Sequence, residues 1–139
     1  MSIIDFLGFD HIDCRVRSLL LVESFYDDLM PLLGLTEKRY AYVDPDGIWH
    51  KEYDNYNAVE YFEPIHPSKP RRFMGLIENP LHRNNETRIA FRVPLDQVPM
   101  LQTLLERIGA QNVEESDDET YPAIFFEDPG GTKLELIGR

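Results

Sequence analysis

The side chains best suited to chemistry lie on stretches where apolar and polar residues alternate. Residues two apart on a strand point the same way, so the alternation places His11, Arg88 and Glu135 on the faces of their strands that a helix does not cover. A neutral imidazole and a carboxylate are good ligands for Zn²⁺, Ni²⁺, Mn²⁺ or Fe²⁺, whereas a guanidinium offers only donors. Cys14 is the only cysteine, so any metal needs histidine and carboxylate ligands.

An internal repeat supplies the elements that must position these residues. The alternating segment 11–16 recurs as 88–93, and each copy leads into a stretch with the apolar spacing of a half-buried helix. Ser18 and Asp96 are expected to cap the two helices. Strand-like runs follow each helix, so each half of the chain is predicted to fold as β-α-β-β-β.

Two registers are open for the end of the first repeat. The favoured one makes 73–77 the last strand, so that Gly75 corresponds to Glu135 of the second repeat. The rival makes Glu60 correspond to Glu135, but it leaves 65–85 as a long connector, which compact domains rarely contain.

Composition and charge exclude several classes of partner. The chain has 139 residues, with 14 Lys and Arg against 25 Asp and Glu, and its formal net charge is −11. A negative net charge of this size repels phosphate groups, so it disfavours binding to nucleic acid and to anionic membrane surfaces. The longest aliphatic run, 19–22, is far shorter than the roughly 20 residues that cross a bilayer. We expect a cytoplasmic protein, with the acidic run 114–119 as a solvated loop.

Several motifs together resemble the vicinal oxygen chelate superfamily, which includes glyoxalase I, extradiol dioxygenases, fosfomycin-resistance enzymes and bleomycin-resistance proteins. The resemblance covers nearly the whole chain. The motifs are His11 in the first strand, Phe25-Tyr26 in the first helix, Gly34-Leu35 after it, and the run 126–131 that leads to Leu134-Glu135-Leu136.

The resemblance implies an α+β fold of two tandem βαβββ modules, in which a curved mixed sheet surrounds a cleft and the helices lie outside. It implies one domain over residues 1–139, with module one at about 7–80 and module two at about 84–139. It also implies a small-molecule ligand in the cleft and a homodimer.

Members of the superfamily often hold a divalent metal between the first and last strands of the modules. The resemblance places His11, Arg88 and Glu135 at three of the four ligand positions. Arg88 stays protonated and cannot bind a metal, so His11 and Glu135 need a further ligand. Glu60, or Glu78 in a shifted strand, could supply it, and the implied metal site is therefore His11, Glu135 and Glu60.

In the competing interpretation Arg88 takes the place of the metal. It would pair with Glu135 and present donors to a carboxylate or enolate oxygen of a ligand, with both residues in catalytic roles if a reaction occurs. A purely structural ion pair between Arg88 and Glu135 is equally open. The other candidates for ligand binding are Asp13, Arg92, Trp49 and Tyr121.

Three functions remain open. The first is a glyoxalase-like lyase or isomerase, or a dioxygenase, in which a metal acts as a Lewis acid for vicinal substrate oxygens. The second is a metal-free protein that binds or sequesters a small molecule, as bleomycin-resistance proteins do. The third is a catalytically silent interaction domain, in which His11 and Glu135 would affect only stability.

Overall fold

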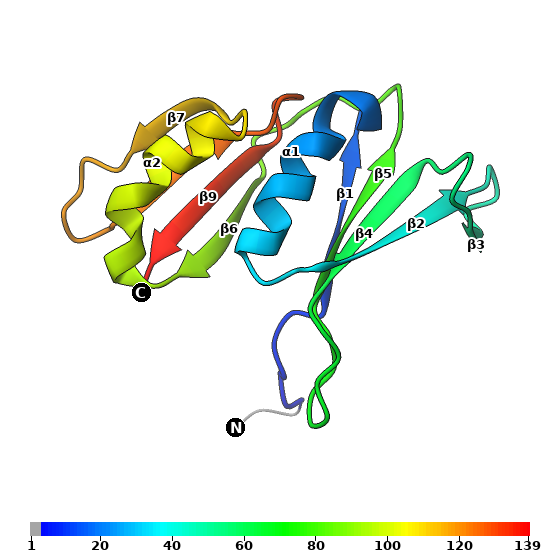
Figure 1. The fold of residues 1–139 in the computed structure, drawn as a ribbon, viewed down its shortest axis with the longest axis horizontal. Coiled ribbons are helices and arrows are strands. Elements are labelled where there is room, and N and C mark those ends of the chain that lie inside the picture. Colours follow the sequence, from blue (N-terminus) through cyan, green and yellow to red (C-terminus); the bar gives the residue numbers. More distant parts are fainter. Residues whose placement is uncertain (1–3) are drawn as a thin grey trace. The chain divides into compact units, whose positions relative to one another are not determined.

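A computed structural model describes residues 4–139 (Figure 1). The elements of the first half are β1 (His11–Val16), α1 (Leu19–Leu32), β2 (Glu37–Val43), β3 (Trp49–Lys51), β4 (Ala58–Phe62) and β5 (Phe73–Glu78). Those of the second half are β6 (Arg88–Val93), the 3₁₀ turn η1 (Leu95–Gln97), α2 (Val98–Arg107), β7 (Gln111–Glu115), β8 (Ala123–Glu127) and β9 (Lys133–Gly138).

The strands form two sheets whose orders match. The five-stranded sheet has the order β1-β5-β4-β2-β3, and the four-stranded sheet has the order β6-β9-β8-β7. In both sheets the first strand lies beside the last; β6 and β9 run parallel, whereas β7, β8 and β9 are antiparallel. The short β3 is an extra strand paired only with β2. The matching orders confirm the predicted tandem βαβββ modules.

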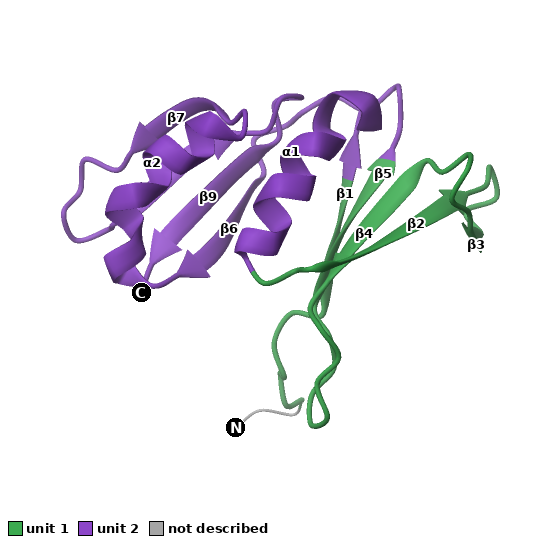
Figure 2. Cartoon of the chain, in the orientation of Figure 1, with its two compact units in different colours: residues 1–14, 34–77 green, residues 15–33, 78–139 purple. Residues whose placement is uncertain are grey.

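The chain divides into two compact units that differ from the two repeats (Figure 2). Unit 1 contains residues 1–14 and 34–77, and unit 2 contains residues 15–33 and 78–139. Helix α1 therefore belongs to unit 2. Its Tyr26 hydroxyl donates a 2.6 Å hydrogen bond to Asp128, a carboxylate that is fully buried.

The helix starts show where local sequence signals hold and where they fail. Ser18 caps α1 as predicted, because its hydroxyl accepts a hydrogen bond of 3.4 Å from the Leu21 amide. The prediction that Asp96 caps the second helix is wrong. Pro94 is extended and the chain turns directly into η1, so Asp96 lies inside this turn and α2 begins later, at Val98.

Each unit has a core of strand residues, joined in unit 2 by the inner faces of the helices. In unit 1 the best-buried side chains belong to β4 and β5, and they are Ala58, Val59, Tyr61, Met74 and Leu76. In unit 2 the buried residues of α1, α2, β8 and β9 include Phe25, Tyr26, Leu29, Leu105, Ile124, Phe126, Leu134 and Leu136.

The pairing within the first sheet decides between the two predicted registers. Phe73–Glu78 is the last strand of the first repeat, as the favoured register required, and Glu60 of β4 lies opposite Gly75 of β5.

No helix among residues 4–139 is long and apolar enough to cross a membrane.

Candidate functional site

A polar row crosses the sheet of unit 1. His11 and Asp13 stand two residues apart on the exposed face of β1, and Nε2 of His11 is 3.6 Å from Oδ2 of Asp13. In the strand register, Gly75 of β5 lies opposite Glu60 of β4, and Glu60 lies opposite Arg39 of β2. The fold thus gathers three predicted site residues, His11, Asp13 and Glu60, within one unit.

Gly75 makes room for this row. A Cβ atom at position 75 would lie 2.5 Å from Oδ1 of Asp13 and 3.8 Å from Cγ of Glu60. The Asp13 carboxylate therefore lies over the glycine and faces Glu60 across β5. A larger residue at this point would displace the Asp13 side chain.

Burial and neighbouring charges shift the pKa values of two residues in the row, His11 and Glu60. Nδ1 of His11 lies 2.6 Å from Oδ1 of Asp10, and this hydrogen bond is the main cause that raises the pKa of His11, with Asp13 and Glu60 adding to it. Burial raises the pKa of Glu60, and the nearby charge of Asp13 raises it further. The row therefore favours the retention of protons.

An aromatic stack borders the same row. The imidazole of His11 stacks on Phe73 with 4.3 Å between ring centroids, and Phe73 stacks on Phe62 at 4.4 Å. The guanidinium groups of Arg39 and Arg71 lie 4.5 and 4.6 Å from the Phe62 ring centre. His11 is thus held by a carboxylate at one nitrogen and by a ring against its face.

The second group of site residues lies in unit 2 around Glu135. Glu135 is only 5% exposed, and its Oε1 accepts a 2.7 Å hydrogen bond from the Tyr121 hydroxyl. This bond is the main cause that raises the pKa of Tyr121, while the positive charges of Arg139 and Arg88 oppose the shift. Tyr121 and Glu135, both predicted as site residues, therefore act as one hydrogen-bonded pair.

Arg88 does not pair with Glu135. Its guanidinium lies 4.7 Å from the ring centre of Phe125, and no ion pair joins the two residues in the part of the chain that the structure describes. The parallel register explains this, because Glu135 lies opposite Ala90 whereas Arg88 lies opposite Lys133. The predicted ion pair is wrong, and Arg88 is left exposed with its donors accessible.

Two predicted ligand-binding residues stand apart from these groups. Trp49 is 40% exposed on β3, at the edge of the five-stranded sheet. Arg92 is exposed on β6, in register with Ile137. Their roles stay predictions.

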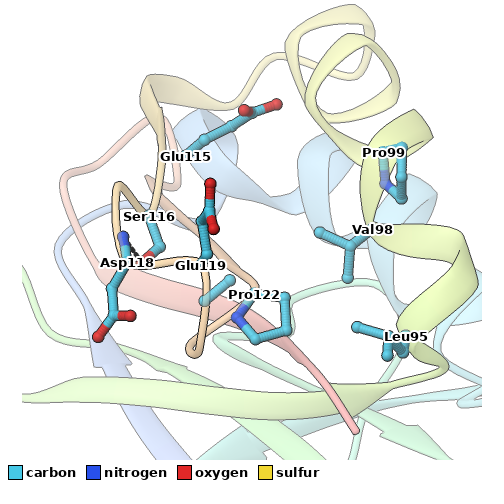
Figure 3. A pocket seen from close by; sticks show the side chains of 9 residues that line it. Leu95, Val98, Pro99, Glu115, Ser116, Asp118, Glu119 and Pro122 are labelled. Atoms are coloured by element: carbon cyan, nitrogen blue, oxygen red, sulfur yellow. Dashed lines mark hydrogen bonds between the residues drawn. The ribbon is translucent and has the colours of Figure 1, made fainter.

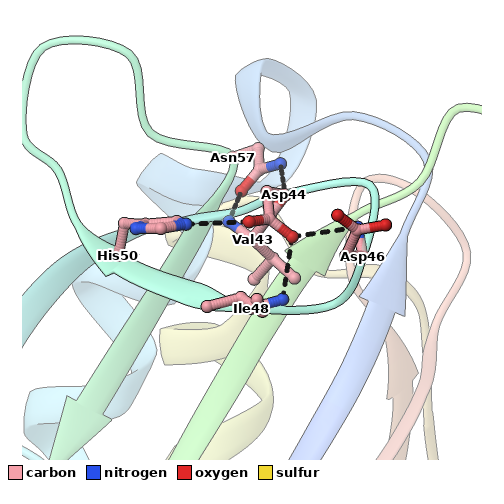
Figure 4. Close-up of polar contacts among 6 residues, drawn as sticks. All are labelled: Val43, Asp44, Asp46, Ile48, His50 and Asn57. Carbon is pink, nitrogen blue, oxygen red and sulfur yellow. Dashed lines mark hydrogen bonds and ion pairs between the residues drawn. The ribbon is translucent and has the colours of Figure 1, made fainter.

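The loop between β2 and β3 holds a further polar cluster (Figure 4). Oδ1 of Asp44 accepts hydrogen bonds of 2.9 Å from the amides of Asp46 and Ile48, and Oδ2 lies 2.9 Å from Nε2 of His50. The His50 contact is the main cause that lowers the pKa of Asp44. Each polar contact of Asp44 closes the turn, so the cluster shapes the hairpin.

The sequence did not single out three residues that the structure places at these sites. Asp10 and Phe73 hold His11, and the guanidinium of Arg139 lies 5.4 Å from the Tyr121 ring centre. Asp10 precedes His11 directly, and that adjacency was the one available signal. The contacts of Phe73 and Arg139 depend on strand pairing.

The donor sets of the two units differ in their fit to a metal. Unit 1 offers an imidazole and two carboxylates, which suit a divalent transition metal. Unit 2 offers Glu135 next to a guanidinium, which does not. Among residues 4–139, no three His, Cys, Asp or Glu side chains gather closely enough to hold a metal ion. The predicted set of His11, Glu60 and Glu135 draws on both units and stays a prediction.

Comparisons with known proteins identify similar folds. No protein-family model matches the chain, and a search of curated proteins finds no significant match. A glyoxalase/bleomycin resistance protein from Albidiferax ferrireducens T118 has a TM-score of 0.60 at 20% identity, over 94% of this chain and 98% of its own. An integron cassette protein from the mobile metagenome of the Halifax Harbour sewage outfall has a TM-score of 0.61 at 18% identity, over 96% and 100%.

A third similar structure contains ligands. It is a mutant of the fosfomycin resistance protein FosX from Listeria monocytogenes, in complex with Mn(II) and 1S,2S-dihydroxypropylphosphonic acid. Its TM-score is 0.59 at 18% identity, over 96% of this chain and 93% of its own. The neighbours thus include glyoxalase/bleomycin resistance and fosfomycin resistance proteins, and this chain has the fold of the vicinal oxygen chelate superfamily.

Proposed function

We propose that the chain binds a small organic anion without a metal and that Arg88 recognises the anionic group. The observation that carries the proposal is the environment of Arg88 in unit 2. Its exposed guanidinium is held against Phe125, and the same sheet face carries the buried Glu135 hydrogen-bonded to Tyr121. A guanidinium in this position can donate two parallel hydrogen bonds to a carboxylate or phosphonate.

The surroundings of Arg88 support this assignment. The ring of Phe125 offers an apolar surface for the body of a ligand, while the cation–π contact limits the motion of the guanidinium. Arg139 adds a second positive charge near Tyr121. FosX, which shares the fold, was solved with a small organic phosphonate. The proposed role is that of a protein that binds or sequesters a metabolite or drug.

A titration of small anions tests the proposal. Benzoate and phenylphosphonate would be titrated by calorimetry in EDTA, with benzyl alcohol as the uncharged probe. We expect the anions to bind better than the alcohol, and Arg88→Gln to weaken their binding by up to about fivefold, as expected for one exposed charge contact. Arg107→Gln, which removes an arginine at the end of α2, is the matched control and should leave the affinity unchanged. Equal binding of the alcohol, or no effect of Arg88→Gln, would contradict the proposal.

A metal-assisted lyase, isomerase or dioxygenase reaction is the second candidate function. The donor types of unit 1 favour it, because the imidazole of His11 and the carboxylates of Asp13 and Glu60 are donors that Zn²⁺, Ni²⁺, Mn²⁺ and Fe²⁺ accept. Among residues 4–139 these three side chains do not gather closely enough to hold an ion, so they would have to move together to bind one. Metal content would be measured in protein purified without chelators or a histidine tag. Near-stoichiometric metal that His11→Ala and Glu60→Ala both lose would replace the metal-free proposal with this one.

We also infer that the chain acts as a homodimer. Ile4, Phe6, Leu7 and Phe9 are 75–96% exposed, so the segment before β1 presents four large apolar side chains to solvent. Exposed apolar groups at this density are typical of interaction surfaces. Light scattering after size exclusion should give the mass of a dimer, and Phe6→Ser with Leu7→Ser should give the monomer. A stable dimer should persist at a protein concentration of about 100 micromolar. A wild-type chain that is monomeric at this concentration would contradict the inference.

A further inference from the structure

A pocket of about 360 Å³ opens in unit 2 between the start of α2 and the loop that joins β7 to β8 (Figure 3). Leu95, Val98 and Pro122 contribute apolar surface, and Glu115 and Glu119 contribute carboxylates. The pocket lies outside the residues assigned to anion binding. A complementary ligand would therefore combine an apolar surface with a positively charged group.

The apolar wall is fixed in place by Gly138. A Cβ atom at this position would lie 2.8 Å from Cγ2 of Val98 and 3.1 Å from Cα of Leu95, so the start of α2 rests directly on the end of β9. The Gly138 amide also donates a 2.8 Å hydrogen bond to the Pro122 carbonyl. One backbone position therefore anchors both apolar sides, and the pocket is formed before any ligand enters.

The acidic side is a structured loop with two free carboxylates. The Ser116 amide donates to the Ala123 carbonyl at 2.9 Å, and Asp118 accepts hydrogen bonds from the amide and hydroxyl of Thr120 at 2.9 and 2.6 Å. In contrast, the carboxylates of Glu115 and Glu119 have no hydrogen bond or ion pair to any of the residues 4–139. Figure 3 shows Glu115 at the end of β7 and Glu119 on the loop, with Val98 and Leu95 on the opposite side and Asp118 pointing away.

We propose that this pocket binds a small organic cation, whose apolar body contacts Leu95, Val98 and Pro122 and whose ammonium group is held by Glu115 and Glu119. Charge complementarity selects this occupant. Two uncompensated carboxylates on a chain of net charge −11 repel anions and attract cations. The apolar wall adds contact area that a hydrated inorganic ion would leave unused. This site is independent of the proposed anion site at Arg88.

Three probes with the same phenylalkyl body separate charge from shape. Phenethylammonium, 2-phenylethanol and 3-phenylpropionate would each be titrated into ¹⁵N-labelled protein, and amide shifts would be followed at Val98, Ser116, Glu119 and Ala123. We expect saturable shifts confined to this region with phenethylammonium, weaker ones with the alcohol, and none at these four amides with the carboxylate, whose binding belongs to Arg88. Added salt should weaken the binding of phenethylammonium, because the carboxylates are exposed.

Variants of consecutive glutamates provide a matched control. Glu115→Gln and Glu119→Gln should each weaken phenethylammonium by up to about fivefold, as expected for one exposed ion pair. Glu114→Gln removes the same charge from the adjacent residue of β7, which points to the other face of the strand, and should change the affinity little. Equal affinity for the alcohol, no saturable shift with the ammonium compound, or an equal effect of Glu114→Gln would each overturn the proposal.

Discussion

The Tyr121 hydroxyl donates a hydrogen bond to the buried carboxylate of Glu135, 14 residues further along the chain. The bond joins a residue two positions before β8 to the middle of the last strand. It also raises the pKa of Tyr121, because a negatively charged acceptor holds the phenol proton in place.

Removal of the charge at position 135 should therefore lower the pKa of Tyr121. In Glu135→Gln the amide oxygen can still accept the hydrogen bond, but the negative charge that opposes phenolate formation is lost. A ¹³C NMR titration of the tyrosine ring carbons would measure this change. Glu114→Gln serves as the control, and an unchanged Tyr121 titration in Glu135→Gln would contradict the assignment of the raised pKa to this bond.

Two neighbouring aspartates should affect His11 unequally. Both raise its pKa, Asp10 mainly through the hydrogen bond to Nδ1 and Asp13 through its charge. We expect Asp10→Asn to lower the His11 pKa more than Asp13→Asn does, in ¹H–¹⁵N spectra of the imidazole. Asp13→Asn should in addition lower the pKa of Glu60. The reverse order of the two aspartates would show that the contact between Asp10 and His11 is absent in solution.

Acid should remove the stabilising effect of Glu63. Its carboxylate accepts hydrogen bonds from the backbone amide, Nε and Nη2 of Arg72, and this pairing lowers the Glu63 pKa to about 2. A depressed folded-state pKa gives stability that is present above the unfolded value near 4.5 and is lost as the pH falls towards 2.

Urea unfolding of Glu63→Gln measures this effect. At pH 7 we expect a loss of about 0.5–1 kcal/mol, since Arg72 is largely exposed and solvent screens the pair. The difference from the wild type should shrink steadily between pH 4.5 and 2. A difference that stays constant over this range would show that the hydrogen bonds do not depend on the charge.

Asp128 should be among the most costly residues to replace. It is fully buried, and its carboxylate accepts hydrogen bonds from the Tyr26 hydroxyl and from the amides of Gly130 and Thr132. Asp128→Ala leaves these donors without their acceptor, so we expect a loss of about 2–4 kcal/mol in the free energy of unfolding. Asp117→Ala, at an exposed position of the β7–β8 loop, should cost less than about 0.5 kcal/mol.

The period-two alternation predicted which side chains share a face. In both β1 and β6 the burial pattern is that of alternate exposed and covered residues ending in a buried valine, as the sequence indicated for His11 and Arg88. Alternation is a local property of a strand, so it does not depend on which strands become its neighbours in the fold. The partner of each side chain is a property of the register, and the offset that separates Arg88 from Glu135 along β6 and β9 cannot be obtained from either strand alone.

The glycine-rich turn after β8 shows a second limit. Residues 126–131 carry part of the family resemblance, and the sequence 128–131 is typical of a turn, yet Asp128 also bonds to α1, about a hundred residues earlier in the chain. Turn propensity describes only the local role of an aspartate. Its long-range contact depends on which unit the helix joins.

The placement of α1 in unit 2 determines how the protein should respond to a break in its backbone. The chain passes from one unit to the other at residues 14–15, 33–34 and 77–78, so neither unit is a continuous piece of sequence. Cleavage in the exposed segment 83–87 would leave α1 on one fragment and its partner Asp128 on the other. The two halves should therefore remain associated after a nick, whereas a gene encoding residues 84–139 alone should give a product with an uncovered apolar surface and poor solubility.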